Sequence, residues 1–175
     1  MKKVLIVAVL TAESFAGFTQ DKTDAKPLSF SAGIEGNLPI GDIATGIKFS
    51  DASNFGVGLY AQGAYKVADE MAITFHAGYT SFMAKEDGFD DVTVIPVLAG
   101  IKYHFNEKFY AAGQLGVSFI SNFNDDSQTA FTYAPGIGYQ LSKFDLSLNY
   151  TGRSFKIDET SCNMSSIGLR VAYCF

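Results

Sequence analysis

Eight segments of this sequence alternate between large apolar residues and small or polar ones, and this period of two constrains the fold most. In segment 108–120, Phe109 and Leu115 share one parity, whereas Gln114 and Ser118 share the other. Successive side chains of a β-strand point to opposite faces, so the alternation predicts strands rather than helices. The expected strands are 28–39, 54–66, 70–83, 92–104, 108–120, 129–141, 144–153 and 164–175.

The connections between these segments are alternately short and long. The short ones cover 67–69, 105–107 and 142–143, and the long ones cover about 40–53, 84–91, 121–128 and 154–163. This pattern is typical of an antiparallel barrel inserted into a membrane from one side. A strand of ~10 residues rises ~33 Å and, tilted by ~45°, spans ~23 Å, close to the ~25 Å apolar band of such barrels. No apolar run reaches the ~18 residues that a membrane-spanning helix requires.

The sizes of the side chains indicate which face points outward. One face of the predicted sheet carries most of the Phe, Tyr, Leu, Ile and Val, and the other is rich in Gly, Ala, Ser and Thr. The interior of an eight-stranded barrel is only wide enough to be filled by side chains, so dozens of large groups do not fit there. The large face therefore points outward, which only lipid tolerates.

Aromatic residues of the large face gather at one end of the predicted strands. Such residues concentrate at membrane interfaces, and strand propensity alone does not explain clustering at one end. The cluster comprises Phe30, Tyr65, Tyr103, Phe105, Phe109, Tyr139, Phe144, Tyr173 and Phe175.

The last segment, 167–175, alternates throughout and ends on Phe175, with Val171 and Tyr173 on the same parity. Here the sequence resembles small bacterial outer-membrane β-barrels of the OmpA/OmpX type, also described as the outer membrane protein β-barrel domain family. The resemblance implies an eight-stranded, antiparallel, up-and-down transmembrane barrel over residues 28–175. It also implies that Val171, Tyr173 and Phe175 belong to the signal read by the outer-membrane assembly machinery.

The first 16 residues have the pattern of a secretory signal peptide. Lys2 and Lys3 precede the apolar run 4–10, and Ser14 and Ala16 are small residues that fit positions −3 and −1 of an expected cleavage site after Ala16. A short buried strand or helix is the alternative. We expect residues 17–27 to be a flexible polar segment ahead of the barrel domain.

The inward parity collects polar and charged residues. Buried charges need partners, so these side chains should form a hydrogen-bonded and ion-paired network filling the lumen. Glu35 and Arg170 lie at similar depths on the first and last strands, which are neighbours in a closed barrel, so we expect them to pair. An ion pathway is the alternative, but eight strands leave little room for one. The expected network is Glu35, Tyr60, Gln62, His76, Lys102, Gln114, Asp145, Asn149 and Arg170.

Two prolines and a change of parity interrupt the pattern. Pro96 and Pro135 fall inside strands, where each removes a hydrogen-bond donor, so we expect β-bulges beside them. Val92 and Val94 are out of phase with the later part of their strand, and the parity also slips near Phe82.

Little in the sequence indicates catalysis or metal binding. His76 and His104 have no metal-ligand spacing with another His or Cys. His76 is followed by Ala77, Gly78 and Tyr79, which do not resemble the His, Ser and acid motif of outer-membrane lipid acylases and deacylases. Cys162 is expected in the last external loop as an exposed thiol. It lies too far along the strand from Cys174, up to ~40 Å, for a disulfide. We therefore expect no catalytic residue, no metal and no cofactor.

The predicted external loops are acidic. They contain ten acidic and three basic residues, which gives them a net charge of −7. A solvated surface explains this charge most simply, and weak Ca²⁺ binding or a basic partner is the alternative. The best acidic cluster is 86–91, which lacks the spacing of an EF-hand loop. The whole chain has a net charge of −5 and a pI of about 4.9, which argues against nucleic acid as a partner.

The sequence therefore predicts a barrel with a structural or surface-interaction role in the bacterial outer membrane, through envelope integrity or adhesion by the external loops. We expect no open general pore and no enzyme. The expected partners are outer-membrane lipids, lipopolysaccharide and the barrel assembly machinery, and the expected state is a monomer. The rival functions are an outer-membrane lipid-modifying enzyme and a soluble lipocalin-like barrel that binds ligands.

Overall fold

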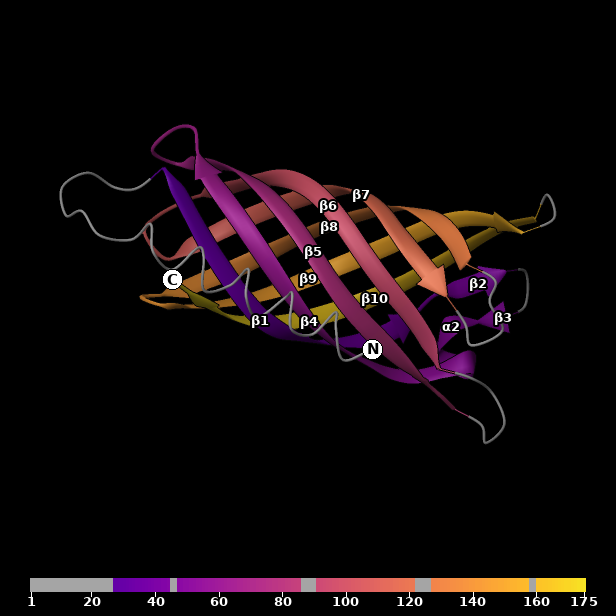
Figure 1. Ribbon diagram of the computed structural model, residues 1–175. Helices are drawn as coiled ribbons and strands as arrows, with labels where there is room; N and C mark the ends of the chain where they lie inside the picture. Colours follow the sequence, from indigo (N-terminus) through magenta and orange to yellow (C-terminus); the bar gives the residue numbers. More distant parts are fainter. Residues whose placement is uncertain (1–26, 45–46, 86–90, 122–126, 158–159) are drawn as a thin grey trace, which may run out of the picture.

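The computed structural model describes residues 27–44, 47–85, 91–121, 127–157 and 160–175, and these form a closed β-barrel (Figure 1). None of the described helices is long and apolar enough to span a membrane. The eight barrel strands are β1 (Leu28–Ile40), β4 (Ser53–Lys66), β5 (Met71–Ala84), β6 (Val92–His104), β7 (Phe109–Ser121), β8 (Ser127–Leu141), β9 (Phe144–Ile157) and β10 (Thr160–Cys174). The predicted signal peptide, 1–16, and almost all of 17–27 lie outside the described residues.

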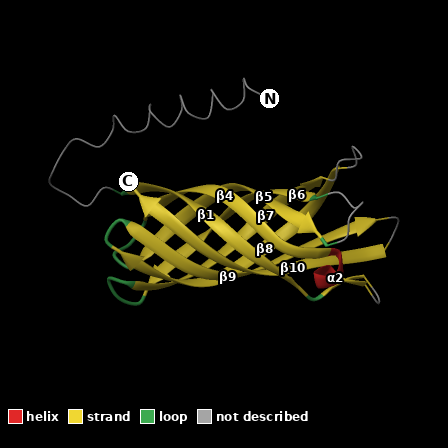
Figure 2. Ribbon diagram, turned by 90° about the horizontal axis from the view of Figure 1, so that it is seen from below, coloured by secondary structure: helices red, strands yellow, loops and turns green. Residues whose placement is uncertain are grey.

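All neighbouring strands run antiparallel in sequence order, and β10 closes the barrel against β1. The eight-stranded up-and-down fold predicted from the sequence is thereby confirmed. Tight turns at 67–70, 105–108 and 142–143 gather at the end where the chain terminates, which we call the turn end (Figure 2). The opposite end, where β2 (Asp42–Ala44), β3 (Ile47–Lys48) and the short helix α2 (Phe49–Ala52) lie, is the loop end (Figures 1 and 2).

The large apolar side chains face outward, as their volume predicts. On β7, Leu115 is 58% exposed whereas its neighbour Gln114 is 4% exposed. Phe109, Leu148 and Val171 also lie on the outer wall. This distribution is the inverse of that in a soluble barrel, where such a wall would face water, and it contradicts the lipocalin-like alternative.

The lumen accommodates its large side chains because glycines lie opposite them. A Cβ atom added to Gly138 would lie 2.1 Å from the Tyr110 ring, and one added to Gly136 would lie 2.2 Å from the Asn149 side chain. Neither position has room for a side chain. Glycine at these inward positions therefore leaves the space that the neighbouring Tyr110 and Asn149 side chains occupy.

The bulges predicted beside Pro96 and Pro135 are wrong. Near Pro96, the pairs Ala77↔Val97 and Thr80↔Val94 keep one register. Near Pro135, Tyr133↔Gly152 and Gly136↔Asn149 do the same. Each residue of an antiparallel sheet directs its N–H toward only one of the two neighbouring strands. A proline therefore removes a hydrogen bond to one neighbouring strand only, and the pairing continues without the extra residue of a bulge. A register shift does occur elsewhere, between β4 and β5 at Ser53–Phe55.

The apolar residues that are out of phase near Phe82 and Pro96 do lie on the inner face, but they mark no break in the strands, whose register continues past them. Phe82 and Val94 point inward with their strands and are fully buried. They belong to the apolar cluster, a group that closes the lumen at the loop end and consists of Phe49, Phe82, Val94, Ile120, Ala130 and Met164. Phe49 reaches this position from α2, where its N–H donates to the Gly41 carbonyl oxygen at 2.9 Å, and its ring lies 5.2 Å from that of Phe82.

The last hairpin is longer than predicted. β9 and β10 extend through most of the segment expected to be a loop, 154–163. The outer face of this extension is polar, and Ser154 donates to Asn163 there at 2.7 Å. Cys162 is buried within β10, which corrects the prediction of an exposed loop thiol, and it is not joined to Cys174 by a disulfide.

Candidate functional site

The candidate site is the polar lumen, defined by the nine inward-facing residues named above. Eight of them are only 2–8% exposed, and Gln62 is partly buried. They come from β1, β4, β5, β6, β7, β9 and β10, so seven of the eight barrel strands contribute a side chain to the network. Their side chains converge because inward positions of a closed barrel all face one narrow axis.

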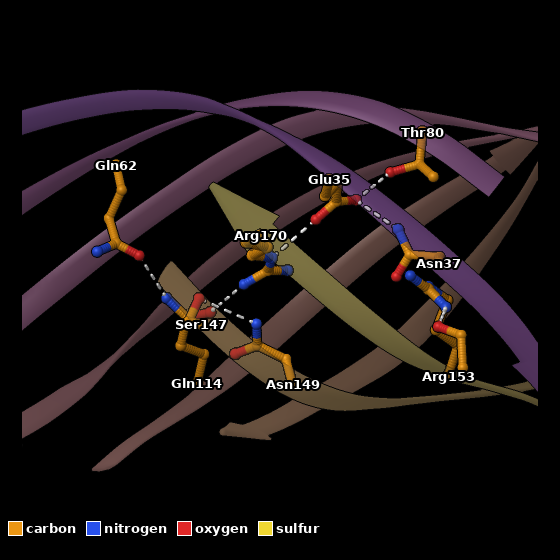
Figure 3. A network of polar contacts seen from close by, with 10 residues as sticks. Glu35, Asn37, Gln62, Thr80, Gln114, Ser147, Asn149, Arg153 and Arg170 are labelled. Atoms are coloured by element: carbon orange, nitrogen blue, oxygen red, sulfur yellow. Dashed lines mark hydrogen bonds and ion pairs between the residues drawn. The ribbon is translucent and has the colours of Figure 1, made fainter. Parts of the chain in front are cut away.

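Glu35 and Arg170 form the central ion pair. Arg170 Nε lies 2.7 Å from Glu35 Oε2, and the two residues are direct cross-strand partners on β1 and β10. Glu35 also accepts hydrogen bonds from Thr80 Oγ1 and, at 3.1 Å, from Asn37 Nδ2 (Figure 3). The pair expected from strand position is therefore formed, and neutral donors on two strands complete the shell of the carboxylate.

Arg170 connects this pair to the opposite wall. Its Nη1 donates to Gln114 Oε1 at 3.3 Å, and Gln114 Nε2 donates to Gln62 Oε1 at 3.1 Å (Figure 3). The guanidinium also lies 5.4 Å from the centre of the Tyr60 ring. This chain of contacts runs from β1 through β10 and β7 to β4, and so it crosses the lumen.

A second ion pair, nearer the turn end, joins Lys102 to Asp145. Lys102 Nζ lies 3.0 Å from Asp145 Oδ2, and Tyr110 Oη donates to the other carboxylate oxygen. The ammonium also lies 3.9 Å from the Tyr110 ring centre. Sequence reasoning assigned both charged residues to the lumen but did not pair them, because β6 and β9 are not neighbouring strands.

Arg153 is a buried lumen residue that sequence reasoning missed. It is 3% exposed, donates from Nη1 to Ser166 Oγ at 3.3 Å, and lies 5.6 Å from the Phe82 ring. Its Nε has no partner among the described residues. The alternation that placed Asp145 and Asn149 inward continues to this position and would have identified it.

The two histidines lie at different depths of the lumen. His76 is buried and stacks on Tyr60 with ring centres 5.1 Å apart, and neither of its nitrogens has a hydrogen-bond partner in the described part of the chain. His104 lies at the turn end, 5.6 Å from the Tyr110 ring. Among the described residues, no group of three or more His, Cys, Asp or Glu side chains could hold a metal ion.

Two adjoining spaces lie in the lumen of the described barrel. A vestibule of about 460 Å³ opens at the turn end and reaches Lys102, His104 and Cys174. Beyond it lies a cavity of about 20 Å³ with mostly polar walls. The polar contacts around Arg170 and then the apolar cluster occupy the lumen between this cavity and the loop end.

The external loops are described only in part. Residues 86–90, 122–126 and 158–159 lie outside the described residues, and so does most of the acidic cluster 86–91. At its edge, Asp91 Oδ1 accepts a hydrogen bond from the Ala84 N–H at 3.0 Å.

The C-terminal residues line the outer wall at the turn end. Val171, Tyr173 and Phe175 are all exposed, and the Tyr173 and Phe175 rings lie 5.3 Å apart in an edge-to-face arrangement. The Phe144 ring also lies 5.7 Å from the Tyr173 ring in an edge-to-face arrangement. The aromatic cluster expected at this end therefore contains direct ring contacts.

The barrel is similar in structure to several outer-membrane proteins whose structures have been solved. The attachment invasion locus protein Ail of Yersinia pestis is 18% identical with a TM-score of 0.57, covering 86% of this chain and 100% of Ail. A second structure of Ail, bound to the heparin analogue sucrose octasulfate, is 19% identical with a TM-score of 0.57, covering 85% and 97%. Neisserial surface protein A is 16% identical with a TM-score of 0.58, covering 87% and 98%. At these identities the likeness concerns the fold.

No curated protein matches the chain in sequence. The family profile described as "Outer membrane protein beta-barrel domain" matches residues 4–175, nearly the whole chain. The chain therefore belongs to the outer membrane protein β-barrel domain family and is a protein of the bacterial outer membrane.

Proposed function

We propose that this protein is a closed barrel that supports the envelope and presents its external loops to other molecules, without acting as a general pore. The filled lumen is the observation that carries this proposal. The contacts from Glu35 through Arg170 and Gln114 to Gln62 cross the lumen, and the apolar cluster lies beyond them toward the loop end. A solute the size of a sugar would have to displace both.

A lipid-modifying enzyme is the rival function, and the positions of the histidines argue against it. Such an enzyme needs a general base on the wall that lipid reaches. His76 is buried in the lumen and His104 lines the vestibule at the turn end. We therefore infer a non-catalytic role.

The charge of the loops bears on what they contact. Ail has been solved with sucrose octasulfate, a polyanion. The loops of the present chain carry a net charge of −7, so they should repel such a ligand. We propose basic protein surfaces or divalent cations as their partners, together with the lipids and lipopolysaccharide that surround the barrel.

Assembly completes the proposal. We propose that the outer-membrane assembly machinery reads Val171, Tyr173 and Phe175, that the signal peptide directs export, and that the barrel is a monomer. Replacing Phe175 with Ala tests the first point, since it should lower the amount of folded barrel in the membrane while mutants of the loops do not.

Reconstitution into proteoliposomes tests the closed barrel. We expect no swelling in iso-osmotic sugars and a gel mobility that changes on boiling, as for a folded barrel. Swelling comparable to that given by a porin would overturn the proposal. Replacing each loop in turn with a short turn, followed by binding assays on whole cells, identifies which loop makes contact. Binding that survives all the replacements would remove the surface role.

A further inference from the structure

The cavity of about 20 Å³ lies between two groups of polar side chains. Lys102, Tyr110 and Asp145 form the group nearer the turn end, and Glu35, Arg170, Gln114 and Gln62 belong to the other. In the described part of the chain these two groups share no direct side-chain hydrogen bond. The cavity wall includes members of both groups.

Thr74 is one of the residues that line this cavity. Its side chain is 0% exposed, and its Oγ1 has no hydrogen-bond partner among the described residues. A buried hydroxyl is costly without a hydrogen-bond partner, so one that no protein group satisfies beside a polar cavity favours the binding of a small polar molecule there. Ala112 is the one wall residue whose side chain has no polar atom.

We infer that one ordered water molecule occupies this cavity, bonds to Thr74 Oγ1 and bridges the two polar groups. A cavity holds a water when it offers more than about 10–15 Å³ and two to four polar partners. This one has enough volume for one water, and Thr74, Gln62, Lys102 and Asp145 are among the groups that can complete its shell.

The charges on the wall favour water over an ion. Lys102 and Arg170 oppose a cation, while Asp145 opposes an anion. An ion would also have to lose its hydration shell in so small a space. Water reaches the site from the vestibule, since Ser31, Gln62 and Lys102 line both spaces. The inference goes beyond the proposed function, because it concerns a ligand of the lumen that a closed barrel does not require.

Crystallography of the full barrel in detergent tests the site directly. We expect one density peak at about 2.6–3.2 Å from Thr74 Oγ1 in the wild-type protein. Crystals soaked in bromide or rubidium should show no anomalous peak there. An anomalous peak, or an empty cavity with the Thr74 hydroxyl bonded to protein, would overturn the inference.

Magnetisation transfer from water to the Ala112 methyl group provides a second readout in solution. Thr74→Val keeps the shape but removes the hydroxyl, and the transfer should fall to the level of a methyl group on the outer wall. Thr132→Val is the matched control, because Thr132 is an equally buried lumen threonine whose Oγ1 donates to Ser118 Oγ at 2.7 Å. It should leave the transfer unchanged. Should Thr74→Val fail to fold, the wild-type transfer decides alone, and its absence rejects the water.

Discussion

The polar lumen and the apolar cluster fill neighbouring parts of one barrel by different means. Around Arg170, charged and amide groups hold one another through hydrogen bonds in defined directions. Around Phe82, apolar side chains from six elements meet through packing, including Phe49 from α2. The stability of the polar region depends on each charged or amide group keeping its hydrogen-bond partner. The stability of the apolar cluster depends on its side chains filling the available volume. Mutations should therefore fail for different reasons in the two regions.

The largest effect is expected from removing the central carboxylate. Glu35→Ala leaves Arg170 buried without its anion, and the loss of one partner from a buried ion pair costs about 3–5 kcal/mol. Urea unfolding of the barrel in lipid vesicles measures this loss. Glu35→Gln keeps the shape and should cost less. A cost near zero for Glu35→Ala would mean that water already shields the pair, and the contrast between the two regions would disappear.

Shortening a side chain of the apolar cluster should lower the free energy of unfolding somewhat less than Glu35→Ala does. Met164→Ala leaves a cavity at the loop end, and such changes cost about 2–5 kcal/mol. The same unfolding assay measures it. Because the polar contacts around Arg170 still fill the lumen, sugar uptake into proteoliposomes should not rise. Uptake in this variant would show that the apolar cluster alone seals the barrel.

A smaller effect is expected from one neutral donor of the network. Thr80→Val removes the hydroxyl that donates to Glu35, and a hydrogen bond to a charged group contributes about 1.5–3 kcal/mol. The control is Thr93→Val on the outer wall, where the hydroxyl lies 3.3 Å from that of Tyr79. Unfolding midpoints should separate the two variants. Equal losses would indicate that burial in the lumen does not strengthen these bonds.

The smallest effect is expected at the turn end. Lys66 and Asp69 form an ion pair at 3.2 Å, but both side chains are solvated. Such pairs contribute little because water and salt screen them. Lys66→Ala should leave the unfolding midpoint unchanged within error, at low and at high salt. A loss as large as that of Glu35→Ala would contradict the division between buried and exposed pairs.

The lumen shows how far alternation alone could be followed. It placed Gln114, Asp145 and Arg170 inward and paired Arg170 with Glu35, because β1 and β10 are neighbours whose register follows from strand position. It could not pair Lys102 with Asp145, since contacts across a barrel depend on its diameter and on the stagger of its strands.

The loop end shows a different limit. Val94 and Phe82 lie on the inward parity, and they looked irregular only because inward residues were expected to be small or polar. Phe49 precedes β4 within a segment expected to be a loop, and nothing in its local pattern indicates that its ring enters the lumen. Cys162 was also assigned to a loop. The outer face of the β9–β10 hairpin becomes polar there, so the alternation of apolar and polar residues ends although the strands continue.

By itself, the sequence determined the strands, the face that meets lipid and the closed eight-stranded barrel. These follow from the period of two and from side-chain volume, which are properties of each strand and of the space it must fill. Only the tertiary structure decided which buried charges meet across the lumen and which side chains close its loop end. Those contacts join residues far apart in the chain, and their geometry exists only once the barrel has closed.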